Sequence, residues 1–274
     1  MQQTIIYVGL DVDDTQYHGS ALDKHTGEVI DFKCRPTLKG LLIQLEKLAR
    51  HFPGCTLKLC YEASYIGFTL QRDLAEKGHG CEVVAPTSIP SPRSKQIKTD
   101  RIDASQLAHY YANGLLTVVS IPKLEQEQDR DLLRTRQKLM EQRTELRRHL
   151  QPLLRRNGLH YKAQAQSRTH WTKQHYNWLE RAIEDTSGSL NANMALLLQQ
   201  LKNLNGILAK YDEQIEALAT SPRYREPVQA LTCYKGIKHH FALTMITEIG
   251  DIKRFPHPRQ LVSWIGMDIR EYSS

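Results

Sequence analysis

Short apolar runs separated by turn residues make up the first third of the chain. Residues 5–10 are apolar and rich in β-branched side chains, which is typical of a buried strand. The next two runs are separated by a turn that ends in Gly27, and this pattern predicts a hairpin. Strand and helix patterns then follow one another, with strands at 18–22, 28–32, 56–61 and 82–85, and helices after Thr37, at 67–76 and at 100–113. Residues 1–120 are therefore predicted to form an α/β domain that opens with a three-stranded meander.

Residues 121–226 have a helical pattern with a seven-residue repeat. From Leu190 to Leu218 the apolar residues are separated alternately by four and three positions, and a second series repeats every seven residues from Leu132 to Leu153. This spacing is typical of a coiled coil. The two helices could pair with each other or across a dimer, so we predict a helical region for dimerisation and nucleic-acid binding. A short third region, 227–274, follows.

The composition narrows the class of protein. The chain has 37 Lys and Arg residues against 30 Asp and Glu, a formal charge of +7, and 40% hydrophobic residues, which excludes collagen-like and wholly disordered chains. No apolar run approaches the ~20 residues that cross a bilayer, and the five cysteines include no C-x-x-C pair. We expect a cytoplasmic protein with no membrane segment, and the basic charge favours a nucleic-acid partner.

The positive charge is concentrated in one predicted helix. Between Arg130 and Arg156 there are nine basic and three acidic residues, a net charge of +6. Arginine predominates, and its planar guanidinium suits phosphate and base contacts. The candidate nucleic-acid contacts here are Arg134, Arg136, Arg143, Arg147, Arg148, Arg155 and Arg156. The histidines and tryptophans at 160–178 could stack on bases, but we expect most of them to pack inside the protein.

Four carboxylates lie where predicted strands end or helices begin. Asp11 follows the first strand, Glu62 follows the fourth, and Asp100 and Asp103 lie three residues apart at a helix start. Taken singly, each also fits an exposed turn, a loop or a helix cap. A meander followed by βα units describes the α/β ribonuclease-H-like (RuvC-like) fold. In that fold strands one and four are neighbours and the last helix packs across their ends, so the four acids would meet. Such a cluster requires a divalent cation, and two Mg²⁺ ions bridging a phosphate are the usual solution.

Three sequence blocks resemble those of a known family. The blocks are V-G-L-D-V at 8–12, Y-E-A at 61–63 and K-T-D-R-I-D-A at 98–104. They resemble DEDD-type insertion-sequence transposases, which are bridge-RNA-guided serine recombinases with a RuvC-like N-terminal domain. The third block is the most specific, because its spacing and its flanking residues all match.

The resemblance implies a function and a set of partners. It implies a catalytic, Mg²⁺-binding tetrad of Asp11, Glu62, Asp100 and Asp103, with nucleic-acid contacts at Lys98 and Arg101. The activity implied is Mg²⁺-dependent DNA strand cleavage and exchange at the element ends and target, directed by a guide RNA. The protein would act in the prokaryotic cytoplasm, at the nucleoid, as a dimer formed through the coiled coil or as a tetramer on DNA.

The third region is similar to the start of the family's C-terminal transposase domain. Lys235 and Lys238 stand where relatives carry a proline and a glycine, so either their ammonium groups contact phosphate or the turn itself is altered. The nucleophilic serine of the family falls at Ser274, with Ser273 as the alternative. We expect the chain to be truncated here, so that the serine role belongs to a full-length relative.

Other functions remain open at this point. A RuvC-like metal-dependent endonuclease or resolvase would hydrolyse DNA without a serine nucleophile. A truncated remnant would bind nucleic acid without catalysis. An actin-like ATPase or sugar kinase also begins with a strand that ends in Asp, but it needs a glycine-rich phosphate loop, and residues 12–15 contain no glycine.

Overall fold

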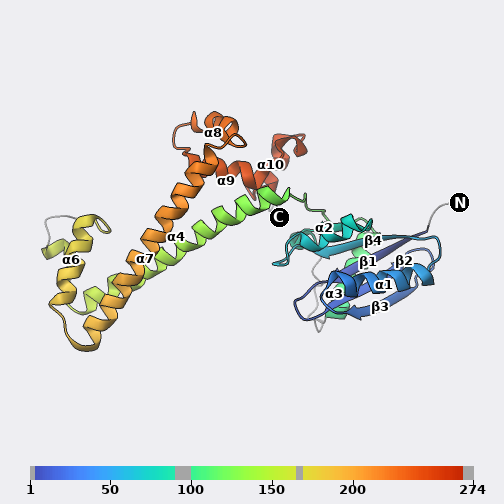
Figure 1. The fold of residues 1–274 in the computed structure, drawn as a ribbon, viewed down its shortest axis with the longest axis horizontal. Helices are drawn as coiled ribbons and strands as arrows, with labels where there is room; N and C mark the ends of the chain where they lie inside the picture. Colours follow the sequence, from blue (N-terminus) through green and yellow to red (C-terminus); the bar gives the residue numbers. More distant parts are fainter. Residues whose placement is uncertain (1–3, 90–99, 165–168, 268–274) are drawn as a thin grey trace, which may run out of the picture. The chain divides into compact units, whose positions relative to one another are not determined.

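The computed structural model describes residues 4–89, 100–164 and 169–267 (Figure 1). The chain divides into two compact units, Met1–Ile121 and Pro122–Ser274, each of which is described by itself. The candidates Lys98, Ser273 and Ser274 lie outside the described residues.

The first unit contains a five-stranded mixed sheet. Its strands are β1 (Ile5–Asp11), β2 (Tyr17–Asp23), β3 (Val29–Cys34), β4 (Thr56–Glu62) and β5 (Gly80–Val84). Their order is β3-β2-β1-β4-β5, with β1 antiparallel to β2 and parallel to β4, and with β4 parallel to β5. This mixed sheet fits the predicted ribonuclease-H-like domain, including the predicted contact between the first and fourth strands.

Helices pack on both faces of the sheet. The bounds are α1 (Leu38–His51), α2 (Thr69–Glu76), the short η1 (Pro86–Ser88) and α3 (Asp100–Ala112). Side chains of β1 such as Ile6 and Val8 share one buried cluster with α1 and α2, whereas α3 contacts β1 and β2 through separate clusters on the other face. Thr37 begins α1 as predicted, because its hydroxyl accepts the Gly40 N–H at 3.1 Å.

The second unit is built on two long helices, α4 (Leu124–Arg156) and α7 (Gly188–Ala219). Leu133 near the start of α4 packs with Ile215 near the end of α7, and Leu146 packs with Leu201, so the two helices are antiparallel. The predicted apolar faces therefore pair within one chain. The other helices are α5 (Tyr161–Gln164), α6 (Lys173–Glu184), α8 (Arg225–Thr232), α9 (His239–Ile249), η2 (Ile252–Arg254) and α10 (Pro258–Trp264). Dimerisation and a separate domain at 227–274 stay predictions.

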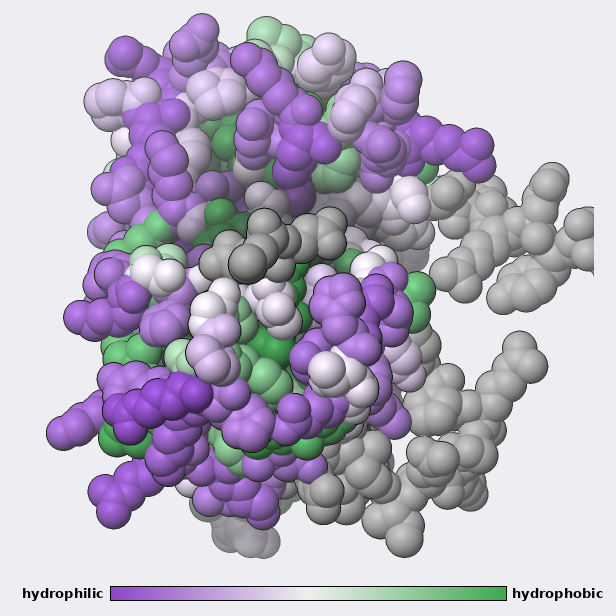
Figure 2. Space-filling view, turned by 90° about the vertical axis from the view of Figure 1, so that its right-hand side faces the viewer, coloured by the Kyte–Doolittle hydropathy of each residue, from purple (hydrophilic) through white to green (hydrophobic). Residues whose placement is uncertain are grey.

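One face of the molecule is largely hydrophilic. On the face drawn in Figure 2, hydrophilic residues predominate, and hydrophobic residues are visible mainly between them. Among the described residues no helix has the length and apolar character to cross a membrane.

Candidate active site

The ends of two neighbouring strands bring two of the predicted carboxylates together. Leu10 of β1 pairs with Tyr61 of β4 in parallel register, so the next residues, Asp11 and Glu62, lie side by side at the same sheet edge. Leu10 and Tyr61 are both buried in the cluster beneath α1 and α2. Because side chains alternate along a strand, Asp11 and Glu62 belong to the opposite face, which α3 covers.

A close contact between β1 and α3 adds the third carboxylate. A Cβ atom built on Gly9 would lie 2.3 Å from the carbonyl oxygen of Ala104 and 2.5 Å from the backbone nitrogen of Ala108. The backbone of α3 therefore lies directly on β1, which only glycine permits at this position. Asp103 immediately precedes Ala104, so this contact brings the start of α3 to the end of β1.

The three carboxylates line one open pocket, which we call the acidic pocket. It has a volume of about 410 Å³, and its polar lining consists of Asp11, Asp13, Glu62, Ser64, Tyr65 and Asp103. Asp100 also lies on α3, but its side chain, like that of Arg101, is outside the described structure. The structure therefore brings together three of the four predicted acids and leaves the fourth as a prediction.

The neighbouring Asp13 has a structural role that distinguishes it from Asp11. Its carboxylate accepts the Thr15 hydroxyl at 2.6 Å and also the Thr15 backbone N–H. These hydrogen bonds lower the pKa of Asp13 below its usual value. Asp13 thus stabilises the turn after β1.

The residue types in the acidic pocket fit a hard divalent cation. Carboxylate oxygens are the ligands that Mg²⁺ prefers, and Asp11, Glu62 and Asp103 bring them to the pocket. In the described part of the chain, however, no three or more His, Cys, Asp or Glu side chains form a group that could hold a metal ion. The chemistry of the donors fits, while the arrangement of the described side chains is not that of a closed coordination sphere.

Two further residues at the acidic pocket were not predicted from the sequence. Ser64 and Tyr65 follow β4 and line the pocket, and Tyr65 is 72% exposed. The sequence gives one indication of them, which is that they closely follow Glu62 at the end of β4. An exposed aromatic ring at the rim of such a pocket can stack on a nucleobase.

Several of the arginines of α4 have partners inside the protein. The Arg134 guanidinium donates two hydrogen bonds, each of 2.7 Å, to the two carboxylate oxygens of Glu248 in α9. Arg136 donates to the carboxylate of Asp212 in α7 at 2.9 Å. Arg143 donates to Asn205 at 3.4 Å, and the Arg147 guanidinium lies 4.9 Å from the ring centre of Trp171. These contacts hold α4 to its neighbouring helices and use part of its charge.

The start of α4 also caps the end of α9. Gln126 and Arg130 donate to the backbone carbonyl of Thr247 at 2.7 and 2.6 Å, and Arg130 also reaches the carbonyl of Glu248 at 3.2 Å. The last carbonyls of a helix have no partner within it, so these donors stabilise the C-terminus of α9.

The remaining basic candidates are exposed. Arg148, Arg155 and Arg156 lie near the end of α4, and Lys235 and Lys238 lie in the turn between α8 and α9. Arg148 has one weak ion pair, to Glu145 at 3.8 Å. The exposed arginines that have no close carboxylate partner among the described residues therefore lie toward the end of α4 that leads into α5 and α6.

Two transposase family models match this chain. The DEDD_Tnp_IS110 family model, described as a transposase, matches residues 8–157, and a second model, for transposases of the IS116/IS110/IS902 family, matches residues 228–274. The chain belongs to the IS110 family of DEDD transposases, which confirms the predicted family and enzyme class.

Individual relatives agree with this assignment. The chain is 28% identical over 260 residues to the transposase for insertion sequence element IS1533 of Leptospira borgpetersenii, covering 93% of this chain and 72% of that protein. It is 31% identical over 208 residues to the transposase-like protein y4qE of Sinorhizobium fredii, covering 76% and 49%. The crystal structure of the large terminase nuclease from thermophilic phage G20c aligns with a TM-score of 0.28 and 13% identity over 40% of this chain and 83% of that chain. A score this low does not by itself establish a shared fold.

Proposed function

We propose that the acidic pocket is the centre at which this chain cleaves and exchanges DNA strands with the help of Mg²⁺. The supporting observation is that Asp11, Glu62 and Asp103, from three separate elements, line one pocket. Membership of a transposase family makes DNA the substrate. Asp100, one turn before Ala104 on the same helix, completes the proposed tetrad.

Electrostatics explains why the pocket would need a cation. Three carboxylates and a phosphodiester all carry negative charge, so they repel one another unless a cation lies between them. When bound, divalent ions supply polarisation of the phosphoryl oxygens and activation of the attacking group. The protein's own part is to fix the carboxylates on rigid strand ends and on a helix that packs directly against β1, which keeps the site organised before the ion binds.

Neutral variants of two carboxylates test this proposal. Asp11→Asn and Asp103→Asn should each weaken Mg²⁺ or Mn²⁺ binding, measured by calorimetry, and lower metal-dependent cleavage of element-end DNA at least ~10³-fold. Unfolding should be unchanged or slightly harder, because each change relieves repulsion between like charges.

Asp14→Asn is the matched control, since Asp14 is exposed and does not line the pocket. It should bind metal and cleave as the unmodified chain does. If Asp103→Asn and Asp14→Asn behave alike in both assays, the acidic pocket is not the catalytic centre.

The proposal assigns the nucleophile to Ser274, with Ser273 as the alternative, on the resemblance to the serine recombinases. In a full-length relative, alanine at the position of Ser274 should abolish the covalent protein–DNA intermediate, and alanine at the position of Ser273 should leave it in place. Continued metal-dependent cleavage by both variants, without a covalent intermediate, would assign the chain to the hydrolytic endonuclease class instead.

The proposal also assigns DNA and guide-RNA contacts to the exposed cations. Arg148, Arg155 and Arg156 are supported by their exposure, and Lys235 and Lys238 by their place in an open turn. Removing the three arginines together should make the log–log dependence of binding on salt shallower by about 0.7–0.9 for each phosphate that the chain no longer neutralises. An unchanged slope would remove these residues from the interface.

A further inference from the structure

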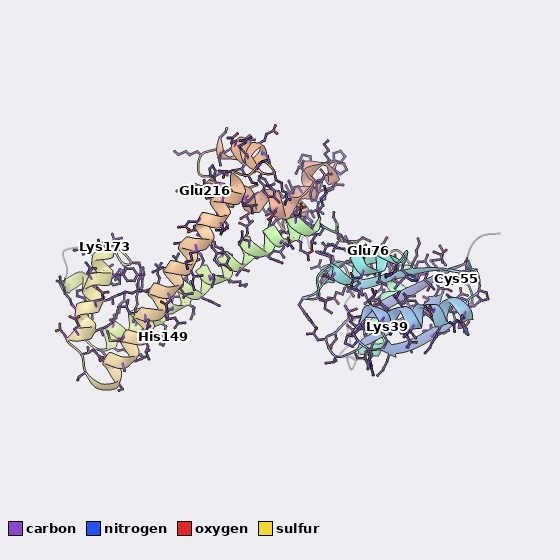
Figure 3. The ribbon with its side chains drawn as sticks, viewed as in Figure 1. Lys39, Cys55, Glu76, His149, Lys173 and Glu216 are labelled. Carbon is purple, nitrogen blue, oxygen red and sulfur yellow. The ribbon has the colours of Figure 1, made fainter. Side chains whose placement is uncertain are left out.

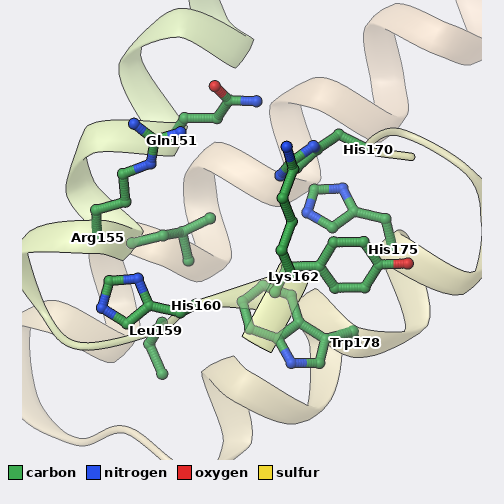
Figure 4. A pocket seen from close by; sticks show the side chains of 10 residues that line it. Gln151, Arg155, Leu159, His160, Lys162, His170, His175 and Trp178 are labelled. Carbon is green, nitrogen blue, oxygen red and sulfur yellow. The ribbon is translucent and has the colours of Figure 1, made fainter. Parts of the chain in front are cut away.

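A small cavity lies at the tip of the helical hairpin, where α4 ends and α5 and α6 follow. It has a volume of about 130 Å³ and is lined from the last turns of α4, from α5 and from α6. Figure 4 shows Arg155 and His160 on one side of it and His170, His175 and Trp178 on the other. We call it the tip pocket.

Two buried polar groups in the wall of the tip pocket lack a hydrogen-bond partner in the part of the chain that the structure describes. His175 is 0% exposed and Tyr161 is 4% exposed. The Trp171 backbone N–H donates to His175 Nδ1 at 3.0 Å, which assigns the ring proton to Nε2. Neither His175 Nε2 nor the Tyr161 hydroxyl has a partner among the described residues. Because unsatisfied buried donors are unfavourable, both groups indicate a ligand that presents an acceptor to them.

The protonation state of His175 supports this assignment. Burial, together with the charges of His170 and Arg147, lowers the pKa of His175 to about 4. The ring is therefore neutral at physiological pH, with one donating and one accepting nitrogen.

The walls of the tip pocket include aromatic rings that pack against one another. The ring centre of Tyr161 lies 4.5 Å from that of His175 and 5.2 Å from that of Trp178, and His175 and Trp178 are stacked 5.8 Å apart at 10°. An apolar cavity of roughly 150 Å³ accommodates a benzene-sized molecule. A volume of about 130 Å³ thus matches one six-membered ring rather than a fused pair.

The opening of the tip pocket is positively charged. Arg155 and Lys162 both line it and are exposed, and no described Asp or Glu lines it. Burial is the main cause of the lowered pKa of His170, and the charges of Lys162 and Arg155 lower it further. Both cations therefore act on the cavity. A ligand that places a ring inside and an anionic group at the opening would satisfy both features.

We propose that the tip pocket binds one unpaired pyrimidine nucleotide of a single-stranded nucleic acid. The base lies against the rings of Tyr161 and Trp178, and its C2 carbonyl accepts from His175 Nε2–H or the Tyr161 hydroxyl. The phosphate lies between Arg155 and Lys162. The inference rests on the nucleic-acid binding expected of a transposase. It adds a base-selective contact at the tip of the helical hairpin, where α4 ends.

Binding of single-stranded oligonucleotides to the full chain tests this inference. Fluorescence anisotropy would compare labelled oligothymidine, oligouridine and oligoadenine of equal length at one salt concentration. The chain should bind a pyrimidine strand about fivefold or more tightly than oligoadenine. Tyr161→Phe, which keeps the ring and removes the hydroxyl, should reduce that preference. A preference shown by oligothymidine, by oligouridine or by both supports the tip pocket and identifies the nucleic acid that supplies the base.

A pair of exposed lysines provides a control that does not depend on the core. Lys162→Gln should weaken pyrimidine binding more than Lys173→Gln, because Lys173 lies at the same end of the hairpin but does not line the cavity (Figure 3). Equal binding of all three strands by the unmodified chain, or equal effects of the two lysine variants, would overturn the inference. The proposed catalytic centre would be untouched by that result, because it is read from metal titration of the acidic pocket.

Discussion

Replacing Gly9 with alanine should disturb both the fold and the acidic pocket. The new methyl carbon would lie 2.3 Å from the Ala104 carbonyl oxygen, 2.5 Å from the Ala108 nitrogen and 2.9 Å from the Leu107 Cβ. Two of these three neighbours are backbone atoms and cannot rotate away. Comfortable contacts require roughly 3.5 Å, so α3 would have to move outward by about 1 Å. Overpacking of this kind costs about 1–3 kcal/mol.

The displacement should also reach the chemistry, because Asp103 is carried on α3. Moving a group that positions reactants by about 1 Å can lower a rate about 10²-fold. We therefore expect Gly9→Ala to reduce the free energy of unfolding of the α/β unit in urea by about 1–3 kcal/mol. Metal binding and metal-dependent DNA cleavage should fall together with it.

Gly206→Ala provides the matched control. Gly206 lies within α7, and a Cβ there would meet nothing within 4 Å. In a helix interior, alanine is more favourable than glycine by about 0.5–1 kcal/mol in folding free energy. The Gly206→Ala variant should therefore be slightly more stable and fully active. If Gly9→Ala unfolds like the unmodified chain and binds metal equally well, the reasoning about the close contact between β1 and α3 is wrong.

Three further predictions concern the core, pH and metal. Leu201→Ala, at a fully buried position between α4 and α7, should cost about 2–5 kcal/mol in urea unfolding, whereas Leu196→Ala, at a 66% exposed position, should change it by less than about 0.5 kcal/mol. Burial lowers the pKa of His175 in the folded chain to about 4. As the pH falls, His175 is therefore protonated in the unfolded chain before it is protonated in the folded one. The helical unit should therefore lose up to about 3 kcal/mol as the pH falls from about 6.5 to 4. His175→Asn should flatten that slope. Removing divalent ions with EDTA should stop DNA cleavage without unfolding the chain, and persistent cleavage would exclude a metal-dependent site.

Local patterns were sufficient to predict the elements of the α/β unit. The strands at 5–10 and 56–61 and the helix capped by Thr37 were evident because periodicity, turn residues and caps all act over a few residues. The observed strands β1 and β4 each extend one residue further, to Asp11 and Glu62. Helix α2 begins at Thr69, two residues later than predicted, since Gly67 adopts a positive φ of 68° that ends the preceding turn.

The site was only partly predictable, for reasons that depend on distance along the chain. Strand order follows from topology, so the meeting of Asp11 and Glu62 could be predicted from the sequence. The contact of Gly9 with α3 depends on how closely two backbones approach, which no pattern encodes. The pairing of Arg134 with Glu248 joins residues 114 positions apart, so a basic run on one helix could not reveal which charges are neutralised within the protein.

The capping of α9 by Arg130 has a consequence for how nucleic acid would approach the helical hairpin. Near the start of α4, positive charge is used on carbonyl groups and on Glu248, whereas Arg155 and Arg156 at its other end have no ion pair among the described residues. Fields from exposed charges extend only about 8–10 Å in physiological salt. Along α4 itself, a polyanion would therefore be attracted more strongly to the end that carries Arg155 and Arg156 than to the start, so this helix does not present a uniform positive charge.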